Sequence, residues 1–271
     1  MSEFSLEAID QSGYRREGFA DHYDAHRPRP PEILLEMLAM YAGGGRLSRV
    51  VDLGGGTGLS TRVWATRAEE VVGVEANRAM LAVAEARTTE PNVRYVEAFA
   101  HETGLRDESA DLVTCSQSFH WMEPVPTLAE AARLLRPGGV FAAYDYDVPP
   151  VLHPEIDAAY SEYLRRRRHW REQHEVQAGW TRRAKHEHLD RIRESGHFRF
   201  AREAVLHDAA DVGVDDVVGF ARSLGLVPEL RALGVTEEEL GLTRLEEITR
   251  RIVGDRRVRW VLGYRVRLGV K

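Results

Sequence analysis

The sequence predicts an α/β protein with a doubly wound, mainly parallel sheet and helices on both faces. Between residues 46 and 149, short apolar segments alternate with amphipathic ones, which is the pattern of strands joined by helical crossovers. Of the 271 residues, 43% are hydrophobic and 30% are charged, as in a globular chain with a sizeable core. The length allows one large domain, or a smaller core that carries an insertion.

Five apolar segments of residues 46–149 read as strands. They cover residues 49–53, 71–75, 93–96, 111–115 and 140–144. Apolar residues at helical spacing predict helices between several of them, around Leu59, Met80 and Leu128. Pro137-Gly138-Gly139 ends the last of these helices and leads into the fifth strand.

The flanking segments differ from this central region. Residues 1–45 hold a polar and aromatic start, a proline cluster and a helical segment, and we interpret them as an N-terminal cover with the first helix. Residues 150–197 combine helical spacing with many Arg, His and Trp residues, and read as a helical insertion or lid. Residues 198–271 include two further β-like segments, around 198–200 and 257–262, which complete the sheet within one structural domain.

The glycine turn after the first strand is the most informative motif. Asp52 is followed by glycines at every second position, Gly54, Gly56 and Gly58. Such glycines tolerate positive φ and let a ligand lie against bare backbone, at the start of a helix whose free N–H groups point toward it. The spacing fits neither the G-x-G-x-x-G dinucleotide motif nor a phosphate loop. An ordinary turn between a strand and a helix is the alternative interpretation.

Glu75 supplies a second anchor for this interpretation. It ends the second strand, where doubly wound nucleotide-binding sheets place the carboxylate that holds ribose hydroxyls. An acidic residue at a strand end is also a common solvated terminus. The turn and the carboxylate together predict a nucleotide-like ligand at the carboxyl edge of the sheet.

Four segments resemble the class I S-adenosylmethionine-dependent methyltransferases. They read VDLGGGTG at 51–58, GVEAN at 73–77, DESADLV at 107–113 and LLRPGG at 134–139. Within that superfamily the chain is most similar to the small-molecule group of the trans-aconitate methyltransferase type, because it also has Tyr23 ahead of Arg27-Pro28 and the pair His120-Trp121. The resemblance implies a seven-stranded Rossmann-like fold, with S-adenosyl-L-methionine as cofactor and S-adenosyl-L-homocysteine as product.

The resemblance also implies a set of cofactor contacts. Asp52 would hold the cofactor ammonium, directly or through water, and Glu75 would take the ribose hydroxyls. Arg27 is a candidate partner for the cofactor carboxylate, with a surface cation as the alternative. Phe99 stands where the family often has an acidic adenine contact, so we expect Ala100 and His101 to substitute. The expected cofactor-binding residues are Tyr23, Arg27, Asp52, Gly54, Gly55, Gly56, Thr57, Gly58, Glu75, Ala76, Met80, Ala100, His101 and Ser116.

His120 is the candidate catalytic residue. Methyl transfer from a sulfonium is an in-line displacement that depends on alignment, and it needs a base only where the acceptor loses a proton. An imidazole titrates near neutral pH, and we expect the loop 116–121 to face the reacting atoms. A structural histidine beside Trp121 is the alternative. Cys115 is the only cysteine and reads as a buried strand residue rather than a nucleophile.

The expected insertion is strongly basic. Residues 164–193 contain ten Lys or Arg against four Asp or Glu, a net charge of +6. A positive lid would suit an anionic substrate or RNA, whereas a solvated helix face is the ordinary interpretation. His186-Glu187-His188 lacks the spacing of a zinc helix, so we expect no metal. The candidate acceptor-pocket residues are Trp121, Tyr160, Trp170 and Trp180, although core packing also accounts for them.

These observations predict a cytoplasmic methyltransferase, monomeric or homodimeric, that acts on oxygen or nitrogen of a small anionic or aromatic metabolite. The formal charge of −6 disfavours a dedicated nucleic-acid binder. Neither a signal-peptide pattern nor an apolar run long enough for a membrane span is present in the sequence, so we expect no membrane partner. An RNA-modifying methyltransferase that uses the basic insertion, and a non-catalytic cofactor-binding protein, are the two alternatives.

Overall fold

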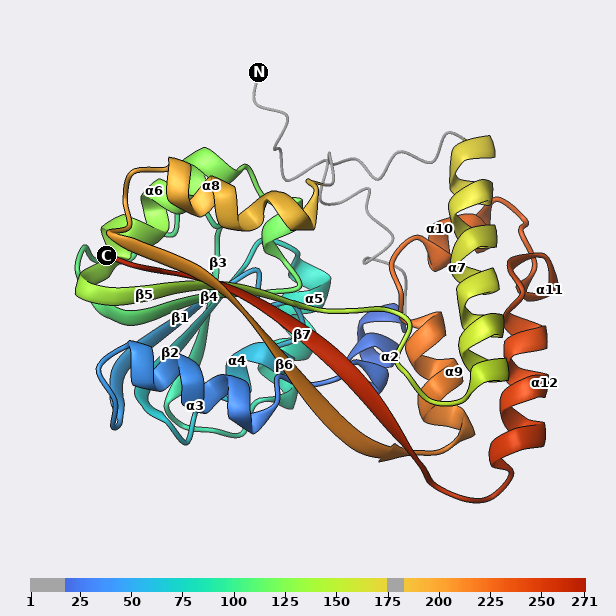
Figure 1. Cartoon of the computed structure of the whole chain (residues 1–271). Coiled ribbons are helices and arrows are strands. Elements are labelled where there is room, and N and C mark those ends of the chain that lie inside the picture. The colour runs from blue at the N-terminus through green and yellow to red at the C-terminus, as the bar shows by residue number, and fades with distance from the viewer. Residues whose placement is uncertain (1–17, 175–182) are drawn as a thin grey trace.

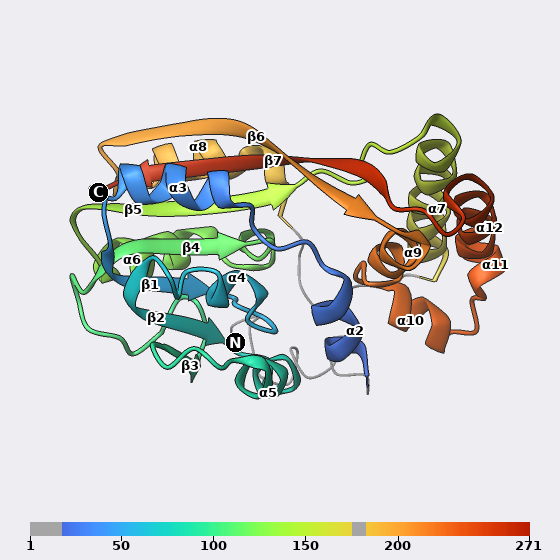
Figure 2. The same cartoon turned by 90° about the horizontal axis from the view of Figure 1, so that it is seen from below.

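The computed structural model describes residues 18–174 and 183–271. Seven strands form one sheet in the order β3-β2-β1-β4-β5-β7-β6, with helices on both faces (Figures 1 and 2). This confirms the predicted α/β class. The strands are β1 (Leu47–Leu53), β2 (Ala68–Glu75), β3 (Val93–Glu97), β4 (Ala110–Ser116), β5 (Leu135–Tyr146), β6 (Phe200–Val212) and β7 (Val258–Val270).

The first five strands are parallel, and β7 runs antiparallel to both β5 and β6. The strand order reverses between β1 and β4, and ligands of open α/β sheets bind outside the carboxyl ends of the strands at such a point. Asp52 of β1 lies opposite Gly73 of β2 on one side and opposite Thr114 of β4 on the other. The sheet therefore brings the predicted motif to the predicted edge.

Helices connect and flank these strands, and two short 3-10 turns, η2 (Phe119–Trp121) and η3 (Lys185–Glu187), lie near the carboxyl edge. Among the described residues, the α-helices before β5 are α2 (Phe19–His26), α3 (Glu32–Tyr41), α4 (Leu59–Arg62), α5 (Arg78–Arg87) and α6 (Pro124–Leu134). Those after β5 are α7 (Pro154–Gln173), α8 (His188–Glu194), α9 (Val214–Arg222), α10 (Val227–Ala232), α11 (Glu237–Leu240) and α12 (Leu242–Val253).

Alternating strand residues supply two apolar cores, one on each face of the sheet. On one face Val50, Leu112 and Val140 belong to a core that includes Leu34 and Leu38 of α3. On the other face Val113 and its neighbours join the buried residues of α6 and α8. The near-continuous apolar run of each central strand follows from this double burial.

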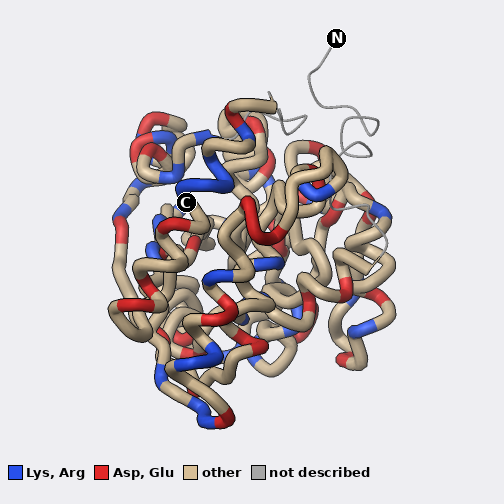
Figure 3. Tube along the Cα trace, turned by 90° about the vertical axis from the view of Figure 1, so that its right-hand side faces the viewer, with Lys and Arg blue, Asp and Glu red and all other residues tan. Residues whose placement is uncertain are grey.

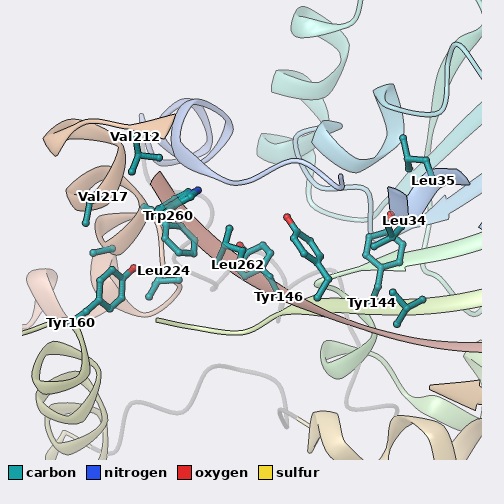
Figure 4. Packing of buried hydrophobic residues seen from close by; sticks show 14 of the residues in the cluster. Leu34, Leu35, Tyr144, Tyr146, Tyr160, Val212, Val217, Leu224, Trp260 and Leu262 are labelled. Carbon is teal, nitrogen blue, oxygen red and sulfur yellow. The ribbon is translucent and has the colours of Figure 1, made fainter. Parts of the chain in front are cut away.

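A helical lobe lies beside the sheet, where α7 packs against α10, α11 and α12, and α9 packs against α12 (Figure 1). The first apolar core is continuous into this lobe, from Leu34 and Tyr144 through Tyr146 and Trp260 to Tyr160 (Figure 4). The lobe and the sheet thus share one buried apolar cluster.

The lobe is built from other segments of the chain than the expected insertion. Residues 150–197 were expected to form one insertion, but α7 packs in the lobe whereas α8 packs against β6, β7 and α6. The other lobe helices come from the segment between β6 and β7. Both of these strands are longer than the sequence indicated, because they pair along their whole length and extend from the sheet toward the lobe (Figure 2).

Among the residues that the structure covers, no helix is both long enough and apolar enough to span a membrane.

Candidate functional site

The glycine turn adopts a backbone that explains its spacing. Gly54, Gly56 and Gly58 have φ of 69°, 58° and 82°, a left-handed conformation that costs other residues about 1–2 kcal/mol. A Cβ on Gly54 would lie 2.7 Å from Cβ of Ser118, and one on Gly58 would overlap the Tyr95 hydroxyl. Gly54 and Gly58 therefore let Ser118 and Tyr95 pack closely on the turn, whereas a Cβ on Gly56 would meet Met80 Cε at 3.4 Å. The turn is a bare-backbone cradle at the carboxyl edge, and its partly exposed backbone at Gly56 fits a ligand that lies against the chain.

Asp52 is fully buried beneath this turn. Ser60 Oγ and Thr61 Oγ1 donate to its Oδ2 at 2.6 and 2.8 Å, and Thr114 Oγ1 donates to its Oδ1 at 2.7 Å. Burial raises the pKa of this carboxyl above its usual value, against the opposing effect of the three hydroxyls. Asp52 thus ties β1, α4 and β4 together, and this arrangement favours an indirect contact with a ligand over a direct one.

Glu75 joins the end of β2 to the glycine turn. The Gly56 N–H donates to Glu75 Oε2 at 2.9 Å, and the Asn77 N–H donates to Oε1 at 2.8 Å. Burial raises the pKa of Glu75 above its usual value, although these backbone donors oppose the shift. The carboxylate is held in a fixed orientation beside the bare backbone of the turn, where it can accept hydrogen bonds from ligand hydroxyls.

The remaining predicted residues of the turn and of the adenine side lie close by. Thr57 is buried, Ala76 is half-buried, and Met80 Cε would lie 3.4 Å from a Cβ on Gly56. After β3, the rings of Phe99 and His101 stack with centroids 5.4 Å apart. A cavity of about 400 Å³ is lined there by Val96, Glu97, Ala98, Phe99, Glu102, Thr103 and Gly104. Ala100 lies in the same loop but is not one of the lining residues.

Helix α2 ties the N-terminal cover to the glycine turn. Asp24 forms a buried ion pair with Arg62, whose other terminal nitrogen donates to the Thr57 carbonyl at 2.7 Å. One helical turn along, the Arg27 guanidinium lies 4.5 Å from the centroid of the Tyr23 ring. The structure thereby brings Tyr23 of α2, and Arg27 directly after this helix, to the side of the core where the turn lies.

Arg27 bridges three elements. It donates to the Tyr146 hydroxyl of β5 and, at 2.9 Å, to the Ser223 carbonyl after α9. Phe220 of α9 lies 5.9 Å from the same guanidinium. The residue is half-buried, which does not fit the alternative of a free surface cation. Whether it also reaches a cofactor carboxylate stays a prediction.

The loop after β4 packs directly on the turn. Ser116 ends β4, and Ser118 Oγ donates to the Leu53 carbonyl at 2.8 Å. Gln117 has φ of 53°, a conformation that is uncommon outside glycine and is often found at functional sites. His120 is buried in η2, and its ring centroid lies 4.9 Å from that of half-buried Trp121. The loop therefore presents the predicted base and Trp121 together, beside the cradle.

A buried polar cluster surrounds His120, and sequence reasoning missed its other members. Asp145 Oδ1 lies 3.6 Å from His120 Nδ1 and 2.6 Å from Lys185 Nζ, and its Oδ2 lies 3.2 Å from an Arg267 nitrogen. His188 completes the cluster, with potential ligand atoms of His120, Asp145 and His188 all within 4.8 Å of one another. The available signal was Asp145 itself, a charged residue inside a strand that otherwise reads as apolar and aromatic.

The cluster also bears on the expectation that no metal binds. Its three side chains have the chemistry of a metal-ligand set, but both carboxylate oxygens of Asp145 already face cationic side chains. A divalent ion would have to displace the Lys185 ammonium. The absence of a metal stays a prediction.

The predicted acceptor-pocket residues do not all meet. Tyr160 is buried in the lobe core, with its ring 5.8 Å from that of Tyr163. Trp170 is half-buried and stacks on His174 of its own helix end, with centroids 5.3 Å apart. Trp180 lies outside the described residues. Of this set, the structure brings Trp121 next to His120.

The arginine run of α7 is largely paired. Glu162 accepts hydrogen bonds from Arg165 and Arg166, and Arg167 donates to the Gly225 carbonyl at 3.1 Å. On the side of the molecule that carries the lobe, basic and acidic segments are interspersed along the trace (Figure 3). This distribution corresponds to the solvated helix face that the sequence allowed, and it does not favour a nucleic-acid footprint.

Comparison with known proteins agrees with this geometry. A family model described as a methyltransferase domain matches residues 51–143. The probable S-adenosylmethionine-dependent methyltransferase CRG1 of Saccharomyces cerevisiae is 31% identical over 162 residues, which cover 57% of this chain and 55% of that protein. The matched segments thus span about half the length of the curated relatives.

Solved structures extend the similarity beyond the matched segment. A candidate type II methyltransferase of Anaeromyxobacter dehalogenans is 25% identical, with a TM-score of 0.66, over 90% of this chain and 97% of that one. A phosphoethanolamine N-methyltransferase of Haemonchus contortus, solved with S-adenosylhomocysteine, is 16% identical with a TM-score of 0.57, over 99% of this chain and 61% of that one. The second similarity concerns the fold alone.

Proposed function

Because residues 51–143 form a class I S-adenosylmethionine-dependent methyltransferase domain, we propose that the whole chain transfers a methyl group from this cofactor to oxygen or nitrogen of a small molecule. The observation that carries the proposal is the joint between Glu75 and the glycine turn, where Gly56 N–H donates to Glu75 Oε2 at 2.9 Å. It fixes a carboxylate next to bare backbone at the switch point of the sheet.

The residues of this edge fit the cofactor. The methionine part would lie against the left-handed backbone of the glycine turn, at Gly56 above all, and Glu75 offers acceptors for two ribose hydroxyls. Met80 and Ala76 flank the turn on the adenine side. Asp52 supports the cradle from below through its three hydroxyl donors, so we assign it an indirect role toward the cofactor ammonium.

His120 is the proposed base on the acceptor side. The cofactor, when bound, supplies an electrophilic methyl group on a sulfonium. The protein then needs to align the acceptor and, where the acceptor carries a proton, to remove it. His120 is buried beside Trp121 in a loop fixed to the turn through Ser118, which is the placement that a positioned base requires.

The acceptor pocket is proposed to lie between this loop and the helical lobe, with the lobe and α2 as its cover. Arg27 connects α2, β5 and α9 there, among the rings of Tyr23, Tyr146 and Phe220. Aromatic rings with one guanidinium among them suit an aromatic or anionic small molecule. Under this proposal the 150–197 segment contributes α7 to the cover, and α8 stays with the sheet.

Transfer of a labelled methyl group tests the proposal. The protein is incubated with methyl-tritiated S-adenosylmethionine and a panel of small aromatic and carboxylated alcohols, phenols and amines, with bulk tRNA as a separate acceptor. We expect label in a small molecule. His120→Ala should lower turnover by about 100-fold or more, in the range of general-base effects, with a smaller effect on cofactor affinity.

His197→Ala is the matched control, because His197 is exposed and should leave turnover unchanged. Label that enters tRNA alone would contradict the small-molecule proposal. Tight cofactor binding without transfer to any acceptor of the panel would favour a non-catalytic cofactor-binding protein instead.

A further inference from the structure

The buried cluster around His120 is assembled from four separate parts of the chain. His120 lies in η2, Asp145 at the end of β5, His188 in α8 and Lys185 in η3. All but Lys185 are buried. Burying a charged side chain is costly unless it is paired. The pairing of the charges in this cluster therefore indicates which side chains act on one another.

Asp145 is the centre of the cluster. Its Oδ1 lies between Lys185 Nζ at 2.6 Å and His120 Nδ1 at 3.6 Å, and its Oδ2 faces Arg267, whose Nε also donates to Glu203 at 2.7 Å. Burial alone would raise the pKa of Asp145, but His120 and Lys185 outweigh it and hold the pKa well below its usual range. The carboxylate therefore stays ionised next to the imidazole.

His188 has a different character from His120. Its Nδ1 lies 3.1 Å from an Arg191 nitrogen, and its Nε2 is buried without a hydrogen-bond partner among the residues described. Burial lowers the pKa of His188 to about 3, which leaves the ring neutral. His120 is thus the histidine of this pair that has the carboxylate as its close partner.

The same segment that supplies Lys185 also clamps the loop of His120. Lys185 Nζ donates to Gln117 Oε1 at 2.9 Å, and the Arg183 N–H donates to the His120 carbonyl at 2.8 Å. Arg183 further pairs with Glu123. Residues 183–185 therefore fix both the carboxylate and the backbone that carries the imidazole.

We propose that Asp145 is the positioning residue for His120, with its carboxylate turned to Nδ1 so that Nε2 is the nitrogen that takes the acceptor's proton. This inference rests on the proposed function. The acceptor's lone pair forms the new bond to the methyl carbon, and the electron pair of the broken carbon–sulfur bond stays on sulfur. The acceptor's proton passes to His120 Nε2, and Asp145 stabilises the resulting imidazolium. Orientation by a carboxylate is a general means of fixing an imidazole tautomer.

The separation of 3.6 Å is longer than a hydrogen bond, and such contacts commonly tighten when ligand binds. A metal ion bound to both His120 and Asp145 would have to displace the Lys185 ammonium from the Asp145 carboxylate. Among the described residues, the charged or titratable groups close to His120 include Asp145 from β5, Lys185 from η3, His188 and Arg191 from α8, Arg267 from β7, and the pair of Arg183 and Glu123.

Nitrogen-15 NMR of the histidine rings tests the proposal without any acceptor. The His120 signal is assigned by its loss in His120→Gln, and its tautomer and pKa are followed from pH 5 to 9. In the wild type we expect the Nδ1–H tautomer. In Asp145→Asn the tautomer should become mixed and the pKa of His120 should fall by about 1 or more, because an opposite charge has been lost.

Glu203→Gln is the matched control, since Glu203 shares Arg267 with Asp145 and should leave the His120 tautomer unchanged. Lys185→Met provides a second variant should Asp145→Asn not fold, and it should raise the pKa of His120 because the ammonium has gone. An unchanged His120 tautomer and pKa in Asp145→Asn, or in Lys185→Met where the former does not fold, would overturn the proposal.

One equivalent of Zn²⁺ bound by the wild type and lost in Asp145→Asn, measured by calorimetry, would also overturn it in favour of a metal site. These measurements do not use the cofactor. Failure of the proposed function would appear separately, as absent binding of S-adenosylhomocysteine.

Discussion

Asp52 and Asp145 are both buried carboxylates at the carboxyl edge of the sheet, and their pKa values move in opposite directions. Asp52 accepts hydrogen bonds from three neutral hydroxyls, and burial raises its pKa. Asp145 faces His120, Lys185 and Arg267, and His120 and Lys185 hold its pKa low despite burial. The first is a structural joint beneath the glycine turn, whereas the second keeps a full negative charge beside an imidazole.

The contrast separates the two halves of the candidate site. The cofactor half is preorganised by polar groups that satisfy one another within β1, β2, α4 and β4. The acceptor half is built from charges contributed by β5, β7, η2 and η3. Changes in the first half should therefore affect stability and cofactor affinity, and changes in the second should affect protonation.

The largest expected effect concerns the ion pair that ties α2 to the turn. Asp24→Ala leaves the Arg62 charge buried and unpaired, since both side chains are less than 10% exposed (8% and 9%). We expect the free energy of unfolding to fall by about 3 kcal/mol or more, as measured by urea denaturation. Asp21→Ala is the control, because Asp21 and Arg87 pair at the surface and should contribute little. Equal free energies of unfolding in the two variants would contradict a stabilising role of the ion pair between Asp24 and Arg62.

A smaller effect is expected from the neutral histidine of the acceptor half. The pKa of His188 is about 3 in the folded protein against an ordinary 6.5, so its contribution to stability is complete above pH 6.5 and is lost as the pH falls toward 3. His188→Phe keeps a ring against Phe119 and removes this titration. Between pH 6.5 and 5, the variant should lose about 2 kcal/mol less of its unfolding free energy than the wild type does.

Chemical denaturation at each pH measures this difference. His186→Ala is the control, since His186 is exposed, and it should keep the wild-type pH dependence. If the unfolding free energy of His188→Phe changes with pH in parallel with that of the wild type, His188 has an ordinary pKa. That result would contradict the description of the acceptor half as a site that keeps His188 neutral.

A side chain at Gly58 in the cofactor half should weaken binding of S-adenosylhomocysteine about tenfold. Gly58 and Gly44 both have left-handed φ, at 82° and 74°, but only a Cβ on Gly58 would meet Tyr95 and Arg62. Both Gly→Ala variants should lose about 1–2 kcal/mol of stability. Gly58→Ala should in addition raise the Kd for S-adenosylhomocysteine by about tenfold, through displacement of the turn. Equal Kd values for Gly58→Ala and Gly44→Ala in calorimetry would contradict the assignment of the glycine turn to the cofactor site.

The smallest effect is expected from the basic face of α7. Replacing Arg165, Arg168 and Arg171 with alanine removes three cations of this helix, of which Arg165 pairs with Glu162 and Arg171 with Glu172. We expect thermal stability and methyl transfer to stay near wild-type values. Steeply salt-dependent binding of bulk tRNA that this triple variant abolishes would contradict the proposed function and support RNA modification.

Local motifs predicted the glycine turn and the position of Glu75 at the edge of the sheet, and their role in cofactor binding stays a prediction. Gly54, Gly56 and Gly58 lie within one turn, and their spacing reports directly on backbone conformation. Glu75 ends the neighbouring strand, so parallel pairing alone brings it to the same edge. The parallel arrangement of the first five strands follows from the alternation of strands and helices.

The acceptor half could not be predicted in the same way. Asp145, Lys185 and Arg267 are far apart in the sequence and meet only through β5–β7 pairing and the path of the chain around α8. The length of β6 was also missed, because its Ala and Asp residues have low strand propensity and pairing with β7 overrides it. Tertiary structure decides both features.

The most direct test of the central claim is a calorimetric titration with S-adenosylhomocysteine. We predict that the wild type binds one equivalent and that Glu75→Gln weakens binding by about 10–100-fold, as expected for lost charge-assisted hydrogen bonds. Glu70→Gln is the matched control, because Glu70 lies near the opposite end of the same strand, β2, and pairs with Arg49 and Arg94. An unchanged Kd in Glu75→Gln would contradict the assignment of the glycine turn and Glu75 as the cofactor site.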